Sequence, residues 1–123
     1  MDKTYLWFTP AIGVAIGILA LSTFLAVPIQ IEGLDDLDKL EHSFAYLTLT
    51  IMFLVAFHKT GNLSVRVRII VFLTAGSYGV LMELLQYYFF EYRHFEWNDA
   101  IANVVGTVIG FIFFGVWQRW NGN

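Results

Sequence analysis

The sequence predicts an all-α membrane protein: a single domain over residues 1–123 that folds as a bundle of about four transmembrane helices, with both termini in the cytoplasm. Hydrophobic residues make up 58% of the positions and charged residues only 14%, against about 25% charged in an ordinary globular domain. Four spans of about 20 residues would use most of the chain. No room is then left for a soluble domain.

The first two apolar stretches differ in length. Residues 4–31 contain no charge over 28 positions, longer than a signal-peptide core of about 7 to 15 residues, so we expect a retained span. Residues 43–57 supply only 15 positions, too few to cross a bilayer. We therefore expect the second helix to begin earlier and to bring Lys39, Glu41 and His42 to the membrane edge.

Two further stretches complete the bundle. Residues 69–90 form a span of 22 positions broken by one acid, Glu83, and residues 100–118 form an uncharged span of 19. The Gly61-Asn62 pair predicts a turn before the third span. Residues 91–99 are predicted to form a polar connection between the third span and the fourth.

The distribution of basic residues predicts the orientation, because lysine and arginine are retained on the cytoplasmic side. Five of the seven flank one side: Lys3, Lys59, Arg66, Arg68 and Arg119. We therefore expect a multi-pass membrane protein whose termini face the cytoplasm, with the connections at 32–42 and 91–99 outside. Belts of aromatic residues typical of membrane interfaces fit this orientation, with Trp97, Tyr87, Tyr88 and Tyr92 outside and Trp7, Trp117 and Trp120 inside.

Polar residues recur at helical intervals in the outer parts of three spans. Residues three or four apart share one face of a helix, and three such sets are Asp38, His42 and Tyr46; Glu83 and Gln86; and Asp99, Asn103, Gly106 and Gly110. Ionisable groups at membrane depth cost about 2.5 to 3.5 kcal/mol each and normally face the bundle interior. The three faces are therefore predicted to form one outward-facing polar pocket.

These same residues carry a family resemblance. The strings Asp38-Lys39-x-x-His42-x-x-x-Tyr46, Glu83-x-x-Gln86 and Asp99-x-x-x-Asn103-x-x-Gly106-x-x-x-Gly110 resemble the signature of the VanZ-like family of small bacterial membrane proteins, over about residues 34–110. Arg93 lies where that family usually has a basic residue. The resemblance implies a four-helix protein of the cell envelope, related to one associated with low-level resistance to the glycopeptide teicoplanin. It implies no particular reaction.

Two classes of function fit the predicted pocket. The first, which we favour, is binding of an anionic or zwitterionic lipid head group or wall-precursor group, with Lys39 and Arg93 as cationic contacts. The ligand-binding residues would be Asp38, Lys39, His42, Tyr46, Glu83, Gln86, Arg93, Asp99 and Asn103. The second is a membrane enzyme that acts on such a component, with Glu83 or Asp99 as general base and His42 transferring a proton. Water or a substrate hydroxyl would then have to be the nucleophile. A proton or ion pathway fits less well, because the inner halves of the spans are almost entirely apolar.

A metal site is an alternative use of His42, beside Asp38 and Glu83, since imidazole and carboxylates are ordinary zinc ligands. However, Lys39 and Arg93 belong to the same region, and cations weaken a metal site. We therefore expect no metal or cofactor. Membrane lipids are the expected partners, nucleic acid is not, and the oligomeric state stays open.

Structural roles are the remaining alternatives. Asn98 or Asp99 suits the N-cap of the fourth helix, and Glu83 could form an ion pair with Lys39 or Arg93. The pairs Gly13-x-x-x-Gly17 and Gly106-x-x-x-Gly110 are expected to let helices approach closely. His58 and His94 are expected to be solvated loop residues.

Overall fold

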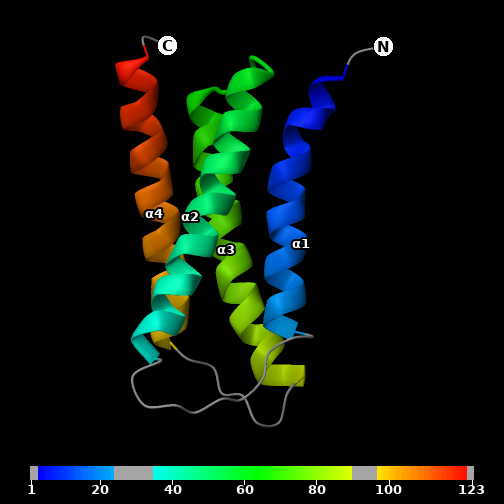
Figure 1. Cartoon of the computed structure of the whole chain (residues 1–123), viewed down its shortest axis with the longest axis vertical. Helices are drawn as coiled ribbons and strands as arrows, with labels where there is room; N and C mark the ends of the chain where they lie inside the picture. Colours follow the sequence, from blue (N-terminus) through cyan, green and yellow to red (C-terminus); the bar gives the residue numbers. More distant parts are fainter. Residues whose placement is uncertain (1–2, 24–34, 90–96, 122–123) are drawn as a thin grey trace.

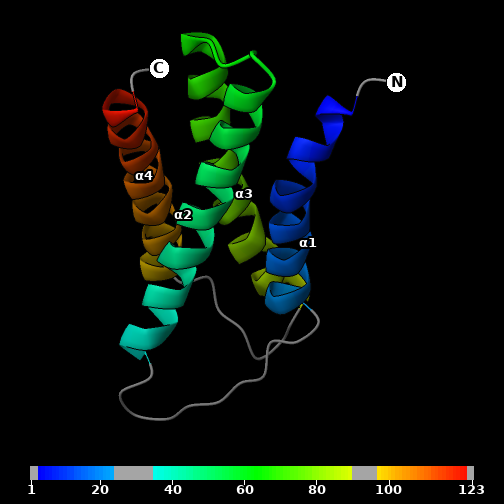
Figure 2. The ribbon, with the colours of Figure 1, turned by 45° about the horizontal axis from the view of Figure 1, so that its top comes forward.

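Four long helices lie side by side in the computed structural model (Figures 1 and 2). The structure describes residues 3–23, 35–89 and 97–121, and their side chains except at 22, 23 and 35–38. A short 3-10 helix, η1 (Thr4–Phe8), leads into α1 (Thr9–Thr23), and α2 (Asp35–Lys59), α3 (Val65–Phe89) and α4 (Trp97–Trp120) follow. The described residues form helices and no strand, which confirms the all-α prediction.

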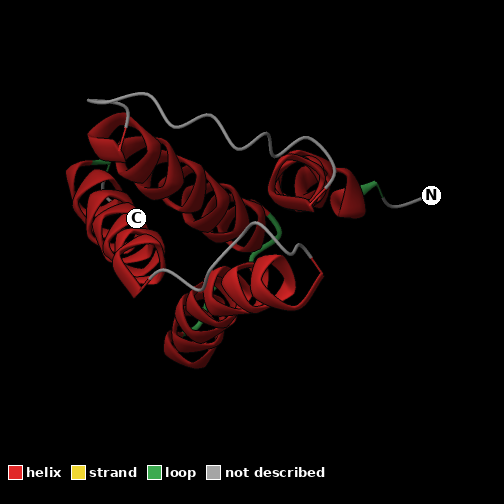
Figure 3. Ribbon diagram, turned by 90° about the horizontal axis from the view of Figure 1, so that it is seen from below, coloured by secondary structure: helices red, strands yellow, loops and turns green. Residues whose placement is uncertain are grey.

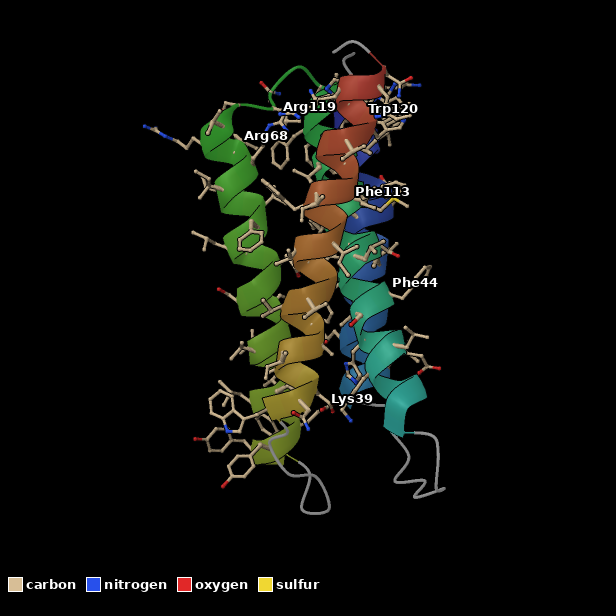
Figure 4. All side chains as sticks on the ribbon, turned by 90° about the vertical axis from the view of Figure 1, so that its left-hand side faces the viewer. Lys39, Phe44, Arg68, Phe113, Arg119 and Trp120 are labelled. Atoms are coloured by element: carbon tan, nitrogen blue, oxygen red, sulfur yellow. The ribbon has the colours of Figure 1, made fainter. Side chains whose placement is uncertain are left out.

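All four helical segments are long and apolar enough to cross a membrane, over Thr4–Leu21, Lys39–Lys59, Val65–Phe89 and Trp97–Trp120. Large apolar side chains point outward along the bundle, as Phe44 and Phe113 do (Figure 4). Phe44 is 68% exposed and Phe113 is 62% exposed. Such exposure along whole helices suits a lipid solvent. Four helices of this kind could span a membrane, which suggests a multi-pass membrane protein.

The observed helix bounds agree in part with those predicted from the sequence. α2 begins at Asp35, well before the apolar stretch, as its shortness predicted. α2 ends at Lys59, and Gly61 then adopts a φ of 74°, a conformation that glycine tolerates best, so the predicted turn is confirmed. The prediction that residues 91–99 are all connection is wrong, because α4 already begins at Trp97. The later part of the predicted first span, residues 24–31, lies outside the described residues.

Both termini lie at one end of the bundle (Figure 1). The start of α2, the end of α3 and the start of α4 together form the opposite end, which we call the distal end. Seen from below, along the bundle, the helices are arranged around one another rather than in a flat layer (Figure 3). Polar residues at the distal ends of α2, α3 and α4 are thereby brought to one depth.

The closest helix contact joins α2 to α4. A side-chain carbon at Gly106 would overlap the backbone carbonyl of Ser43, and one at Gly110 would lie 2.8 Å from the Leu47 carbonyl oxygen. The Ser43 hydroxyl also donates a hydrogen bond of 2.8 Å to the Ala102 carbonyl. The prediction of a close approach at Gly106 and Gly110 is thus confirmed, since only glycine lets the two backbones come this near.

The corresponding prediction for Gly13 and Gly17 is wrong in the described part of the chain. A side-chain carbon at either position would meet no heavy atom of a neighbouring element within 4 Å. The contacts of α1 run through other residues, with Ile18 buried in a cluster that contains Tyr46, Leu49, Ala75 and Met82. Gly13 and Gly17 are therefore not sites where a side chain would prevent the packing of α1 against the other described helices.

His58 also differs from its prediction. It lies in the last turn of α2, half-buried, and its ring stacks edge-on at 6.0 Å from Phe114 and 6.1 Å from Trp117. It is therefore a packing residue between α2 and α4 and not a solvated loop residue. His94 lies outside the described residues.

Candidate functional site

Three ionisable side chains from three helices meet at the distal end. His42 of α2, Glu83 of α3 and Asp99 of α4 each place one nitrogen or oxygen within 4.8 Å of the others. Glu83 is 1% exposed and Asp99 is 4% exposed, while His42 is half-buried. We call these residues, with Asn103, the polar cluster. The spacing of polar residues along the three spans therefore indicated a real convergence.

Asn103 connects the polar cluster to the backbone of α3. Its side-chain nitrogen donates a hydrogen bond of 3.3 Å to the Gly79 carbonyl, and its oxygen Oδ1 lies 3.2 Å from Nδ1 of His42. An amide oxygen can only accept, so Nδ1 of His42 carries the proton. Nε2 is then the ring nitrogen of His42 that does not face Asn103.

Gly79 is a residue of this site that the sequence reasoning missed. A side-chain carbon there would lie 2.8 Å from Cβ of Asn103 and 3.3 Å from the Tyr46 ring. Gly79 thus leaves room for the amide that orients His42. Its position four residues before Glu83, on the same helix face, was the available signal.

Tyr46 and Gln86 flank the polar cluster at the predicted positions. Tyr46 follows His42 by one helical turn and is 1% exposed, and Gln86 follows Glu83 by almost one turn and is 3% exposed. The Tyr46 hydroxyl is close enough to Glu83 for their charges to interact, and it has no hydrogen-bond partner among the described residues. A buried hydroxyl in that state is costly, so the site has an unused donor.

The cationic residues of the predicted site are less well placed. Lys39 lies at the distal end, three residues before His42 on α2, and its side chain is half-buried (Figure 4). Arg93 lies outside the described residues, as does the side chain of Asp38. The ion pair of Glu83 with Lys39 or Arg93 therefore stays a prediction.

The capping role predicted for Asn98 or Asp99 is wrong. Both residues are inside α4, which begins at Trp97, and Asp99 is the acid of its first turn. A carboxylate there still interacts favourably with the helix dipole. Because Asp99 is 96% buried against its neighbours, its side chain also faces the bundle interior and not the solvent.

The serine and threonine hydroxyl groups near the polar cluster are engaged with the backbone, unlike the hydroxyl of Tyr46. Ser43 donates to the Ala102 carbonyl at 2.8 Å, Thr50 to the Tyr46 carbonyl at 2.8 Å, and Thr107 to the Asn103 carbonyl at 3.0 Å. Such bonds to backbone carbonyls leave these oxygens poorly placed for attack on a substrate. Chemistry at this site would therefore use water or a substrate hydroxyl as nucleophile.

Comparison of the chain with protein-family models, with curated proteins and with solved structures gives no match. The candidate site therefore depends on its own geometry. The resemblance to the VanZ-like family stays a prediction from the residues quoted above.

Proposed function

We propose that this chain is a multi-pass protein of the bacterial cytoplasmic membrane that binds the polar head group of an envelope lipid or lipid-linked wall precursor. The head group would be held at the distal end, which would face outward. One observation carries the proposal: His42, Glu83 and Asp99 come from three helices and meet in the bundle interior. Ionisable residues brought together inside a membrane bundle are typical of a ligand site.

Contacts outside the polar cluster also hold the helices together. Gly106, Gly110 and the Ser43 hydrogen bond already join α2 to α4, and apolar clusters pack the remaining interior. Burying two acids costs free energy that apolar side chains would not cost. The acids are therefore better explained by what they bind than by what they stabilise.

A groove beside the polar cluster supports a lipid as the ligand. It is open, has a volume of about 650 Å³, and is lined almost entirely by apolar residues of α3 from Phe72 to Leu84, with Val104 of α4. Val104 follows Asn103 directly. The stretch from Phe72 to Leu84 is about 18 Å long at ~1.5 Å per residue, enough for most of an acyl chain whose head group reaches the distal end.

Charge supports the proposed orientation. The end of the bundle that carries the termini holds Lys59, Arg66, Arg68 and Arg119, whereas Lys39 lies at the distal end (Figure 4). This asymmetry favours a cytoplasmic location for the termini. The resemblance to the VanZ-like family supports the same setting in the cell envelope. It also supports a link to teicoplanin resistance as part of the proposal.

A membrane enzyme that acts on the same class of ligand is the second candidate. The observation that favours it is the position of His42, whose ring has a nitrogen within 4.8 Å of a carboxylate oxygen of both Glu83 and Asp99. Such an imidazole can act as a general base. Since the nearby hydroxyls of Ser43, Thr50 and Thr107 bond to the backbone, the reaction would be a hydrolysis or a transfer to a substrate hydroxyl.

Native mass spectrometry of protein extracted in mild detergent tests the proposal. We expect a lipid adduct on the wild type and on Glu41→Gln, a control that removes an exposed acid next to His42. The adduct should be lost in Glu83→Gln, which removes the buried charge but keeps the shape. An equal adduct on all three proteins would contradict head-group binding at the polar cluster. A change in the mass of the bound lipid on incubation would favour the enzyme.

A further inference from the structure

We propose that His42, Glu83 and Asp99 bind a divalent transition-metal ion, Zn²⁺ in the first place. The alternative metal site predicted from the sequence had Asp38 beside His42 and Glu83, whereas the structure brings Asp99 to these two residues. The metal site concerns the same residues as the proposed function and deepens it, but metal uptake can be measured without any lipid.

The distances suit a metal ion after a small adjustment. The three donor atoms lie within 4.8 Å of one another. Ligands of zinc bind at about 2.0 to 2.2 Å, so two of them can be at most ~4.4 Å apart. A shift of a few tenths of an ångström in one carboxylate oxygen therefore brings even two donors 4.8 Å apart within zinc-ligand distance. The three donors come from three different helices.

The donor types select the class of metal. One imidazole with two carboxylates suits zinc, manganese or iron. Calcium prefers six to eight oxygen ligands, and magnesium retains most of its waters. With three protein ligands, Zn²⁺ would keep an open fourth position, as sites that bind a further ligand do.

The hydrogen bonds around His42 provide independent support. A histidine that binds a metal through one nitrogen almost always donates a hydrogen bond from the other, which sets the tautomer and the ring orientation. Here Nδ1 of His42 donates to Asn103 Oδ1 at 3.2 Å, and Asn103 is itself held by the Gly79 carbonyl. Asn103 is therefore a positioning residue that presents Nε2 of His42 as a ligand.

The Tyr46 hydroxyl is the second independent observation. It is buried, it lies one turn along α2 from His42 within electrostatic reach of Glu83, and it has no hydrogen-bond partner in the described part of the chain. A water or an anionic ligand on the open position of the metal would supply that partner. The unused donor thus points to a further group in the site.

The charges at the distal end are compatible with a metal. Two carboxylates this close require a proton or a positive charge beside them, and a divalent ion supplies two positive charges. Lys39 is only half-buried, so its long side chain can keep the ammonium group in water, away from the ion. If the proposed function holds, the metal would also turn an acidic site into one that attracts a head-group phosphate.

The metal itself is the probe in the test. Full-length protein in detergent, stripped with a chelator, is titrated with Zn²⁺ and separately with Co²⁺, whose visible absorption reports tetrahedral coordination. We expect one Zn²⁺ per chain and a higher melting temperature when zinc is bound. Glu83→Gln and Asp99→Asn should lose the cobalt signal, and Glu41→Gln should keep it.

A pair of variants tests the positioning role of Asn103. Asn103→Asp keeps an acceptor for Nδ1 of His42, whereas Asn103→Leu has a similar size and removes it. Zinc affinity should fall about 10- to 100-fold in Asn103→Leu, the usual effect of losing such a partner, and should be largely retained in Asn103→Asp. Equal affinities in the two variants would contradict the positioning role.

The wild type alone can overturn the metal site, even if a variant fails to fold. If stripped wild-type protein takes up no zinc and gives no cobalt spectrum, the proposal is wrong. Lipid binding that persists in such protein would leave the proposed function standing. Zinc uptake without any lipid adduct would keep the metal site and contradict the proposed function.

Discussion

Asn103 makes hydrogen bonds to two other helices at the candidate site. It sets the tautomer of His42 and it binds the Gly79 carbonyl, so it joins all three helices of the polar cluster. Its 1% exposure means that neither bond competes with water. The orientation of the His42 ring therefore depends on an amide and a glycine that carry no charge.

Glu83 should matter for function more than for assembly. We expect Glu83→Gln and Glu83→Leu to insert and accumulate normally, because each removes one of two neighbouring buried carboxylates and with it the cost of burying that charge. Both should lose lipid binding or the envelope phenotype in a complementation assay. Membrane fractions probed for protein amount are the control, and full activity in both variants would contradict the role assigned to Glu83.

Gly79 and Gly76 form a matched pair on α3. Gly79→Ala places a carbon 2.8 Å from Asn103 and should lower the melting temperature, with a cost of about 1 to 3 kcal/mol for overpacking. Gly76→Ala meets no heavy atom within 4 Å and should be neutral or stabilising by up to ~1 kcal/mol. Thermal unfolding in one detergent compares them, and the opposite order would contradict the packing at Gly79.

At the scale of elements, the contact between α2 and α4 dominates the bundle. Small residues let backbones approach in a lipid solvent, where no hydrophobic effect drives helices together. Gly106 and Gly110 supply that approach, and it places His42 beside Asn103. Helix packing and site geometry thus depend on the same glycine face.

Among glycine-to-alanine substitutions on α4, Gly106→Ala should therefore lower the stability of the bundle most. It would overlap the Ser43 carbonyl, which is backbone and cannot rotate away, so we expect a loss of more than about 2 kcal/mol or failure to accumulate. Gly13→Ala, which meets nothing within 4 Å, is the control. Equal melting temperatures for the two variants would contradict the close approach.

At the scale of the whole molecule, the two ends of the bundle differ in charge and in burial. The polar cluster lies at the distal end, and the termini lie at the other end with most of the basic residues. Trp97 and Trp120 are 73% and 87% exposed at opposite ends of α4, about 35 Å apart at ~1.5 Å per residue. That separation matches a bilayer whose hydrocarbon core is about 30 Å thick and whose interfaces favour tryptophan.

Reporter fusions test the orientation of the whole chain. A reporter inserted at Asn62 should be cytoplasmic, and one inserted at residue 96 should be outside, because basic residues are retained inside. The Asn62 fusion lies in the turn after α2 and should disturb no helix. A cytoplasmic signal from position 96 would place the polar cluster on the inner face and would contradict its proposed access to external ligands.

Much of the fold was readable from the sequence. Apolar stretches of sufficient length, broken by Gly61 and Asn62, require helices because a lipid solvent leaves no other partner for the backbone. The intervals of three and four residues also placed His42, Glu83, Asp99 and Asn103 on faces that converge. The helices follow from the apolar stretches, and the polar faces follow from the helical spacing of polar residues. Both can be read without knowing how the helices pack.

The tertiary structure alone decided which polar atoms meet. The sequence could not distinguish Asp38 from Asp99 as the neighbour of His42, nor show that Asn103 sets its tautomer, because these contacts depend on the depth and rotation of three helices. Glycine positions decide that rotation, and identical motifs behaved differently: Gly106 and Gly110 meet a backbone, whereas Gly13 and Gly17 meet nothing. A glycine pattern indicates that close approach is possible, but only the partner helix makes the contact.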